Sequence, residues 1–450
     1  DRREDLRILI VGLGRSGIAS ARFFAKETCY LYDDDATCYQ KKEVVQLCEE
    51  GCRVVPGRSL ERLIPIVHKV ILSPSVAKTH PVVCLARRYG IPVHSELEEG
   101  LNGYADVIAV TGTNGKTTVC TLLQQILSKA FLKSVPLVGN VGIPASTLCG
   151  RDKDGPVVCE VSSFQAEQST GFRPHVAVLL NLAPDHLNRH RSEESYYRAK
   201  MRLFFYQTPQ DYAVWNADDT RLAAMSRPAA DLFWFSTQNP CRGCYVEGED
   251  ILFQNLEEKQ RICSVRDFGP QPKHCLENIL ACITVAKLYD VPNECIVEGI
   301  KQFSFLPHRT QQCGKTGRFE FIDDSKATNV HATLGALSSF SVPVGCILGG
   351  ADKGEDFRPL LAELKRKGFF AVFQGQTRLA LKAAAEEIGY IAYSEARDLS
   401  QAFDLAVQSI PCGTILLSPA CASFDAFLDF AQRGDCFQQM VAEYCNETKK

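Results

Sequence analysis

The sequence predicts an α/β protein of three domains, each built on a mostly parallel sheet covered by helices. The chain has 450 residues, which is more than one hydrophobic core normally organises. Short apolar runs alternate with helix-like segments, the pattern of parallel strands joined by crossover helices. This alternation restarts near residue 105 and again after residue 306. We therefore expect domains at residues 1–100, 101–306 and 307–450.

The first domain opens with a predicted strand, a glycine turn and a helix, in "RILIVGLGRSGIASARFFA". A second strand is expected at "CYLYDDD", and further strands at "KVILSPS" and "IPVHSE" with the helix-like "PVVCLARRYG" between them. The glycines at 12, 14 and 17 fit the G-x-G-x-x-G spacing of a dinucleotide loop. The same helix start would suit any diphosphate or uridine nucleotide equally well. The turn therefore predicts a phosphate site and leaves its nucleotide open.

The second domain contains four predicted central strands, in "DVIAVTG", "VVCEVSS", "HVAVLLNL" and "DYAVWN". Because ligands of open α/β sheets sit outside the carboxyl ends of the strands, Thr111–Thr118, Glu160–Ser163 and Asn181–His190 should converge on one crevice. The third domain is predicted from "FEFIDDSKATN", "VGCILGG", "FFAVFQG" and "TILLSPACASFD".

The segment "TGTNGKTT" predicts a phosphate loop. Gly112 and Gly115 permit close backbone approach, so that successive N–H groups and the helix N-terminus can hold phosphate oxygens. Lys116 would reach the terminal phosphates, and Thr117 is placed to bind Mg²⁺. The strict G-x-x-x-x-G-K-[ST] pattern fails at Val110, which stands where its first glycine should be.

Composition narrows the class of protein. The formal charge of −3 argues against a general nucleic-acid binder, and no apolar run reaches the ~18 residues of a spanning helix. The 20 cysteines are scattered and show no secretory context, which indicates reduced thiols. Cys241 and Cys244 form one C-x-x-C without the second pair of ligands that structural zinc needs. We expect a cytoplasmic, monomeric enzyme without membrane or nucleic-acid partners.

The motifs taken together resemble those of one family. "TGTNGKTT", "EVSSFQ", "NLAPDHLNRH", "YYRAK", "LPHR", "DDSKATN", "GGADKGEDF" and "LSPACASFDAF" follow the order found in the Mur ligases of peptidoglycan synthesis, and are most similar to the members that add D-glutamate. The resemblance implies a Rossmann-like domain for the UDP-sugar, a P-loop-type ATPase domain and a Rossmann-like domain for the amino acid. It also implies ATP-dependent addition of D-glutamate to UDP-N-acetylmuramoyl-L-alanine through an acyl phosphate.

The resemblance also implies the residues of the site. ATP is expected at Gly112, Thr113, Asn114, Gly115, Lys116, Thr117, Thr118, Asn278, Arg309 and Asp324. Two Mg²⁺ ions are expected at Thr117, Glu160, His186 and Lys200, with Lys200 carbamylated to supply an oxygen ligand, and Lys116, His186 and Lys200 as catalytic residues. The UDP-sugar is expected at Gly14, Arg15, Ser16, Asp33, Ser73 and Asn140, and Ser162 is expected to bind a substrate. D-Glutamate is expected at Lys326, Thr328, Lys353, Ser423 and Phe424.

Four residues depart from the family pattern: Arg15, Asn188, Cys275 and Phe424. Simpler interpretations also stand beside the functional ones: Lys200 as an unmodified lysine on a solvated helix face, Arg309 as a solvated linker residue, and Phe424 as a core residue.

Other functions remain open at this point. A sister ligase with another amino acid or a folylpolyglutamate synthase would share the ATP chemistry, although the first lacks this "SPACAS" tail and the second the "GLGRSG" domain. A nicotinamide dehydrogenase would use "GLGRSG" to bind its cofactor but would leave "GTNGKTT" without a role. A regulator that binds nucleotides without catalysis is the remaining alternative.

Overall fold

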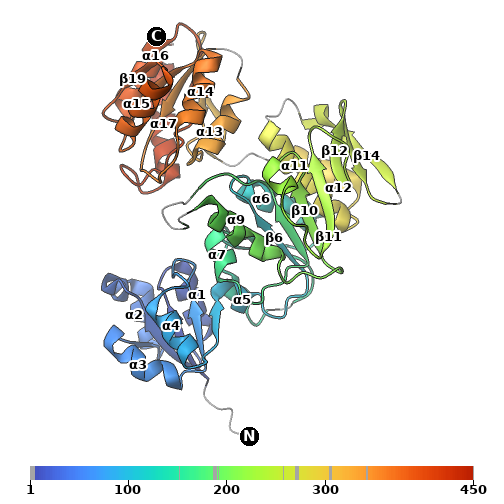
Figure 1. Ribbon diagram of the computed structural model, residues 1–450, viewed down its shortest axis with the longest axis vertical. Coiled ribbons are helices and arrows are strands. Elements are labelled where there is room, and N and C mark those ends of the chain that lie inside the picture. Colours follow the sequence, from blue (N-terminus) through green and yellow to red (C-terminus); the bar gives the residue numbers. More distant parts are fainter. Residues whose placement is uncertain are drawn as a thin grey trace. The chain divides into compact units, whose positions relative to one another are not determined.

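The computed structural model describes residues 6–151, 153–185, 190, 192–256, 258–268, 273–303, 307–340 and 343–448. By their contacts they form two compact units. The first comprises Asp1–Leu182, Tyr197–Asp267 and Asn278–Lys301, and the second comprises Ala183–Tyr196, Phe268–Glu277 and Gln302–Lys450. Within the described ranges the first unit holds two sheets and the second unit one (Figure 1). The predicted α/β class with mostly parallel sheets is confirmed, while the residue limits of the three domains stay a prediction.

The first sheet is parallel throughout, in the order β3-β2-β1-β4-β5. Its strands are β1 (Arg7–Val11), β2 (Thr28–Tyr32), β3 (Arg53–Val54), β4 (Lys69–Leu72) and β5 (Val93–Ser95). The order reverses direction between β1 and β4, which is the topological switch point where doubly wound sheets bind ligands. The glycine turn follows β1 and Ser73 follows β4, so both lie at that point.

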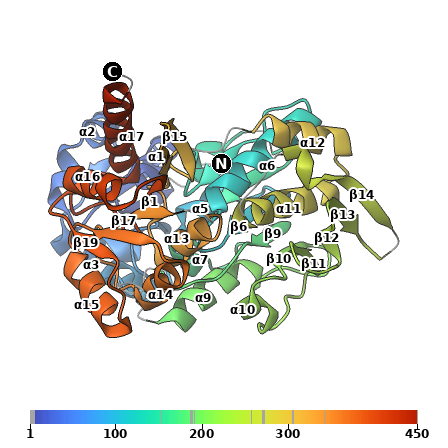
Figure 2. The ribbon, with the colours of Figure 1, turned by 90° about the horizontal axis from the view of Figure 1, so that it is seen from above.

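The second sheet has the order β14-β13-β12-β11-β10-β9-β6-β8-β7. Its strands are β6 (Val107–Thr111), β7 (Leu137–Gly139), β8 (Val157–Glu160), β9 (Val176–Leu179), β10 (Tyr212–Asn216), β11 (Asp231–Ser236), β12 (Gly243–Glu247), β13 (Asp250–Gln254) and β14 (Lys259–Ser264). The strands from β7 to β12 pair in parallel, and β13 and β14 add an antiparallel edge, visible in succession in Figure 2. The phosphate-loop strand β6 lies between β8 and β9.

The third sheet has the order β15-β16-β20-β17-β18-β19, with β15 antiparallel and the others parallel. Its strands are β15 (Gln311–Lys315), β16 (Phe319–Asp323), β17 (Val344–Leu348), β18 (Phe370–Phe373), β19 (Tyr393–Glu395) and β20 (Gly413–Leu417). The adjacent strands β16, β20 and β17 end immediately before "DSKATN", "SPACAS" and "GGADKG". The three motifs predicted to bind D-glutamate, the acceptor amino acid, therefore lie along one edge of this sheet.

Helices connect the strands. They are α1 (Arg15–Phe23), α2 (Lys42–Glu49), α3 (Leu60–Leu63), α4 (Pro81–Arg88), α5 (Glu96–Gly100), α6 (Lys116–Ala130), α7 (Ser163–Gln168), α9 (Glu193–Met201), α10 (Thr220–Ala223), α11 (Lys273–Leu288), α12 (Asn293–Lys301), α13 (Val330–Leu337), α14 (Arg358–Lys367), α15 (Arg378–Ile388), α16 (Leu399–Ser409) and α17 (Phe430–Glu447). None of the helices in the described ranges is long and apolar enough to cross a membrane.

Each sheet is buried on both faces, as its apolar strands predict. In β1, Ile8 and Ile10 pack into one hydrophobic cluster, while Leu9 and Val11 pack into another. In β17, Cys346 and Leu348 face one cluster and Ile347 the other. This alternation follows from the two-residue period of a strand. It fixes the register and so the place where each strand ends.

Candidate active site

The turn after β6 has the shape of a phosphate loop. Gly115 has φ +87° and caps the N-terminus of α6. A Cβ there would lie 2.3 Å from Oδ1 of Asn278, so the position admits only glycine without a shift. Asn278 therefore lies directly against the loop. Lys116, Thr117 and Thr118 form the first turn of α6, where N–H groups and the helix dipole favour anions.

The loop is held from the neighbouring strand β9 by Asn181. The Asn114 N–H donates to Asn181 Oδ1 at 2.9 Å, and Asn181 Nδ2 donates to the Asn114 carbonyl at 3.1 Å. The Thr113 N–H donates to the Asn181 carbonyl at 3.0 Å, and Thr111 Oγ1 donates to the Val161 carbonyl at 2.8 Å. The predicted convergence of the β6, β8 and β9 ends is confirmed for these residues.

Two lysines meet at the loop. Lys116 Nζ donates to the carbonyls of Gly112 and Thr113 at 2.8 Å each, and Lys200 Nζ donates to the same Gly112 carbonyl at 2.8 Å. Lys200 comes from α9 and is only 1% exposed. The interpretation of Lys200 as a lysine on a solvated helix face is therefore wrong. The two ammonium groups therefore donate to one carbonyl of the phosphate loop.

Glu160 fits a metal ligand. It ends β8, is 1% exposed, and accepts a hydrogen bond from Asn140 Nδ2 on Oε1 at 2.7 Å. Its Oε2 is buried and has no hydrogen-bond partner among the described residues. A buried carboxylate oxygen without a donor is costly unless a cation binds it. Thr117 stands at the start of α6, so a hard-oxygen pair suited to Mg²⁺ flanks the loop.

His186 and Asn188 lie outside the described residues. Within the described part of the chain, no group of three or more His, Cys, Asp or Glu residues has the arrangement of a metal site. Cys241 and Cys244 therefore belong to no such group among the described residues. Burial raises the pKa of both thiols, that of Cys241 to about 12.

The glycine turn of the first sheet is organised around Asp33. Its two carboxylate oxygens accept from the N–H groups of Leu13, at 2.6 Å, and Asp35, at 2.9 Å. Ser73 Oγ donates to the Gly12 carbonyl at 2.7 Å and closes the turn from β4. Gly14 and Arg15 remain exposed at the start of α1, with Ser16 half-buried beside them. The structure thus brings these predicted UDP-sugar residues together at the switch point.

Two residues predicted to bind substrate, Arg15 and Ser162, also form hydrogen bonds within the protein. Arg15 Nη2 donates to the Gly142 carbonyl at 2.9 Å, which joins the glycine turn to the loop containing Asn140. Ser162 caps α7 in a reciprocal capping box with Gln165. The Ser162 hydroxyl is therefore already engaged in capping the N-terminus of α7.

In the second unit, the half-buried Arg309 lies near the buried Asp324. Asp324 accepts from Ser418 Oγ at 2.7 Å and from the Thr310 N–H at 3.0 Å. Burial raises the pKa of Asp324 to about 7, although Arg309 acts in the opposite direction. Burial, with Arg309 as the next cause, lowers the pKa of His274 to about 4. Cys275 lies near them, since Asp324 and Arg309 both influence its pKa, which burial raises to about 12.

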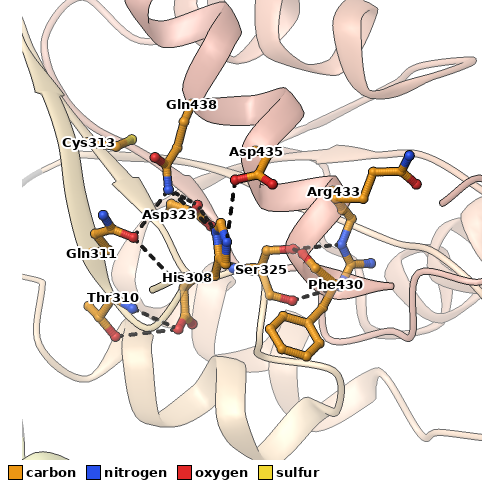
Figure 3. Close-up of polar contacts among 12 residues, drawn as sticks. His308, Thr310, Gln311, Cys313, Asp323, Ser325, Phe430, Arg433, Asp435 and Gln438 are labelled. Atoms are coloured by element: carbon orange, nitrogen blue, oxygen red, sulfur yellow. Dashed lines mark hydrogen bonds and ion pairs between the residues drawn. The ribbon is translucent and has the colours of Figure 1, made fainter. Parts of the chain in front are cut away.

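Sequence reasoning missed the network next to Arg309, shown in Figure 3. His308 Nδ1 lies 2.6 Å from Asp323 Oδ2, and Gln438 Nε2 donates to the same oxygen at 2.7 Å. His308 has φ +62°, unusual for a residue with a side chain. These contacts hold His308 in its strained conformation. The segment "LPHR" could have indicated the network, because its histidine immediately precedes Arg309, the predicted phosphate ligand.

Arg433 of α17 is a second residue that the sequence did not reveal. It is 1% exposed and donates to Ser325 Oγ at 3.0 Å and to the Ser325 carbonyl at 2.8 Å (Figure 3). It also donates to the carbonyls of Ala422 and Cys421 at 3.1 and 3.0 Å. Arg433 thereby ties the "DSKATN" and "SPACAS" turns together.

The predicted acceptor residues gather at the edge where β16, β20 and β17 end. Lys353 Nζ lies 3.3 Å from Asp185 Oδ1, and Asn329 Nδ2 donates to Asp185 Oδ2 at 3.3 Å. Lys326 Nζ lies 3.7 Å above the Phe430 ring, and Thr328 is half-buried two residues later.

Ser423 and Phe424 differ in exposure. Ser423 is buried, whereas the Phe424 side chain is 74% exposed, so the interpretation of Phe424 as a core residue is wrong. Glu355 was not predicted. Its Oε2 accepts from the Val330 N–H at 3.2 Å, and burial raises its pKa to about 7.

Comparison with known proteins places the chain in one family. Residues 6–95 match the MurD-like N-terminal domain of Mur ligases, and residues 110–286 match the Mur ligase middle domain. The UDP-N-acetylmuramoylalanine–D-glutamate ligase of Koribacter versatilis is 36% identical over 99% of both chains. The enzyme of the same name from Streptococcus mutans is 37% identical over 96% of both chains.

Solved structures agree on the fold. MurF from Acinetobacter baumannii aligns with a TM-score of 0.65 over 98% of this chain and 94% of its own, at 18% identity. At that identity the likeness speaks for the fold alone. The relatives above 30% identity cover nearly the whole chain, and the matched domains include the phosphate loop and the glycine turn. This chain belongs to the Mur ligase family.

Proposed function

We propose that the chain is an ATP-dependent ligase that joins D-glutamate to UDP-N-acetylmuramoyl-L-alanine, in the cytoplasm, for peptidoglycan synthesis. The observation that carries this is the meeting of Lys116 and Lys200 at the Gly112 carbonyl of the β6 loop in a Mur ligase, with Glu160 ending the adjacent strand β8. The relatives named for D-glutamate addition select the acceptor from among the family's amino acids. The sister ligases and folylpolyglutamate synthase remain the alternatives that an acceptor assay separates.

The chemistry follows from charge. A carboxylate is a poor acyl donor, so ATP phosphorylates it and an amine then displaces phosphate to give an amide. Lys116 and the α6 N-terminus hold the phosphates and offset the negative charge of the transferring group. Asn181 accepts from the Thr113 and Asn114 N–H groups and so fixes the loop ahead of the α6 N-terminus, where the phosphates bind. Mg²⁺, held by Thr117 and Glu160, would neutralise the remaining charge of the phosphoryl group.

The predicted D-glutamate site contains the positive charge that binding of a dicarboxylate requires. Lys326 and Lys353 supply positive charge, and Thr328 and Ser423 supply hydroxyl donors. In the structure Lys353 is engaged with Asp185. We propose that a D-glutamate carboxylate takes the place of Asp185 beside Lys353. The attacking amine must be neutral, so an acceptor group near its ammonium has to take up a proton before attack.

The test is phosphate release from ATP and Mg²⁺ with UDP-N-acetylmuramoyl-L-alanine and one amino acid at a time: D-glutamate, L-glutamate, D-alanine, lysine or diaminopimelate. Release is expected with D-glutamate alone. Lys116→Met should abolish release, whereas Lys129→Met should retain it, since Lys129 lies on the same helix and pairs with Glu298. Release with a different amino acid would move the chain to a sister activity, and release with none would refute the ligase reaction.

We also propose that Lys200 is carbamylated. Lys200 is buried and shares the Gly112 carbonyl with Lys116, and a carbamate forms when the neutral amine of a lysine attacks CO₂. The carbamate would then supply an oxygen ligand for a second Mg²⁺ together with His186. Incubation with ¹³C-bicarbonate should give a carbamate carbon resonance in the folded protein. Lys200→Arg should lose that resonance, and a wild-type protein without it would contradict the modification.

We expect a monomer without nucleic-acid or membrane partners, and sedimentation at micromolar concentration would reveal any stable oligomer.

A further inference from the structure

The first unit contains a cavity that is lined by none of the residues predicted to bind the UDP-sugar, ATP or D-glutamate. It has a volume of about 310 Å³ and lies among α4, β4, β5 and the end of α7 (Figure 1 labels α4 and α7). It is lined by Leu72, Lys78, Val83, Arg87, Ile91, Pro92, Val93, His94, Ser95, Gln168 and Thr170. We call it the α4–α7 pocket. Its volume falls in the range of small-molecule sites, ~300–1,000 Å³.

One wall of the pocket is apolar and the rest is cationic. Leu72 and Val83 are buried, and Ile91, Pro92 and Val93 continue the apolar wall. Lys78, Arg87 and His94 supply the positive side. The His94 imidazole lies 2.9 Å from Glu99 Oε2, and this contact raises its pKa, which favours its charged form. Such a lining suits an anion with an apolar body.

Lys78 is the strongest sign of an anion. It is half-buried, yet no carboxylate of the described residues forms an ion pair with it. Burial, and then the charge of Arg202, lowers its pKa, while Glu167 and Glu98 act weakly in the opposite direction. Glu98 is already engaged, because its carboxylate accepts from the N–H groups of Thr170 and Gly171 and caps α5. Among the described residues, the Lys78 ammonium therefore forms no direct ion pair, although the charges of Glu167 and Glu98 act on it.

We propose that the α4–α7 pocket binds a small organic acid with an apolar body. The acid group lies against Lys78 and Arg87, and the apolar body covers Leu72 and Val83. A carboxylate and a phosphate ester are both compatible with two cations, and they are separated by the choice of probe.

The test is a binding titration by ligand-observed NMR, with UDP and ADP saturating so that the nucleotide sites do not compete. The carboxylate probe is 4-hydroxyphenylacetate, its neutral counterpart is 4-hydroxyphenylacetamide, and phenyl phosphate represents the phosphate class. At least one acid should bind about tenfold or more tightly than the amide, since a charge-assisted hydrogen bond is worth ~1.5–3 kcal/mol. The tighter of the two acids identifies the ligand class.

Lys78→Met should remove the preference for acid over amide, and Arg87→Met should weaken it. Lys26→Met is the matched control, because Lys26 is exposed and does not line the pocket. Lys78→Met should fold at least as well as wild type, since it removes a half-buried charge, and thermal unfolding checks this. The proposal is overturned if neither acid binds the folded protein more tightly than the amide, or if folded Lys78→Met keeps the preference. No catalysis is involved, so failure here leaves the ligase reaction untouched.

Discussion

At the scale of single residues, buried carboxylates make the second unit sensitive to pH. Asp324 titrates near pH 7 in the folded chain, against ~3.9 in an unfolded one. Between those values the folded protein keeps a proton that the unfolded chain has released. The free energy of unfolding therefore falls as pH rises, by about 1.4 kcal/mol per pH unit for this group, and the loss is complete above pH 7.

Asp324→Asn removes that dependence while an amide can still meet Ser418 and Thr310. We expect the variant to gain stability relative to wild type as pH rises from 5 to 8, measured by urea unfolding at both values. Asp404→Asn, an exposed carboxyl of α16, serves as the control and should show no such gain. If the free energies of unfolding of Asp324→Asn and wild type differed by the same amount at both pH values, the raised pKa of Asp324 would be contradicted.

The residues that sequence could reveal are those whose chemistry is local. Lys116, Thr117 and Gly115 are neighbours in the chain, so their spacing predicts their geometry. The partners of site residues are different. Lys353 meets Asp185 across 168 positions, and Arg433 reaches Ser325 across 108. Spacing contains no information about such pairs, which only the packing of the sheets brings together.

At the scale of elements, the contact of α1 with the glycine turn explains the third glycine of "GLGRSG". A Cβ on Gly17 would lie 1.8 Å from the Gly12 carbonyl and 2.9 Å from Ser73 Oγ. Gly17→Ala should therefore push α1 from the turn, lower the free energy of unfolding by about 1–3 kcal/mol, and weaken UDP binding. Thermal unfolding and a UDP titration measure the two effects.

Gly14→Ala is the matched control. Gly14 has φ −80°, and a Cβ there would meet nothing within 4 Å. This variant should keep wild-type stability. If both variants lost stability equally, the turn would depend on its flexibility and not on the close approach of α1.

Strands were predicted well where they are central and poorly where they are peripheral. β6, β8, β9 and β10 are continuous apolar runs because neighbouring elements bury both faces. The antiparallel β14 is exposed or half-buried over its first three residues and buried only at Ile262 and Cys263. The apolar-run criterion therefore does not predict it, and the polar face of an edge strand is the physical reason.

At the scale of the whole molecule, the predicted ligand sites divide between the two units. The UDP-sugar residues Gly14, Asp33, Ser73 and Asn140 all belong to the first unit, and the D-glutamate residues from Lys326 to Phe424 all belong to the second. Arg309 and Asp324 also belong to the second, whereas the phosphate loop and Asn278 belong to the first. ATP is thus the one substrate whose predicted contacts come from both.

Amide hydrogen exchange should show this division. UDP alone should slow exchange at the glycine turn and the 139–143 loop, because binding stabilises the folded segments it contacts. D-Glutamate alone should slow exchange at the "DSKATN" and "SPACAS" turns and leave the glycine turn unchanged. ADP with Mg²⁺ should slow exchange at residues 112–118 and also around Arg309. Protection by UDP in the second unit alone, or by D-glutamate in the first alone, would reverse the assignment of substrates to sheets. The distinction is direct because each probe ligand carries only one of the recognised groups.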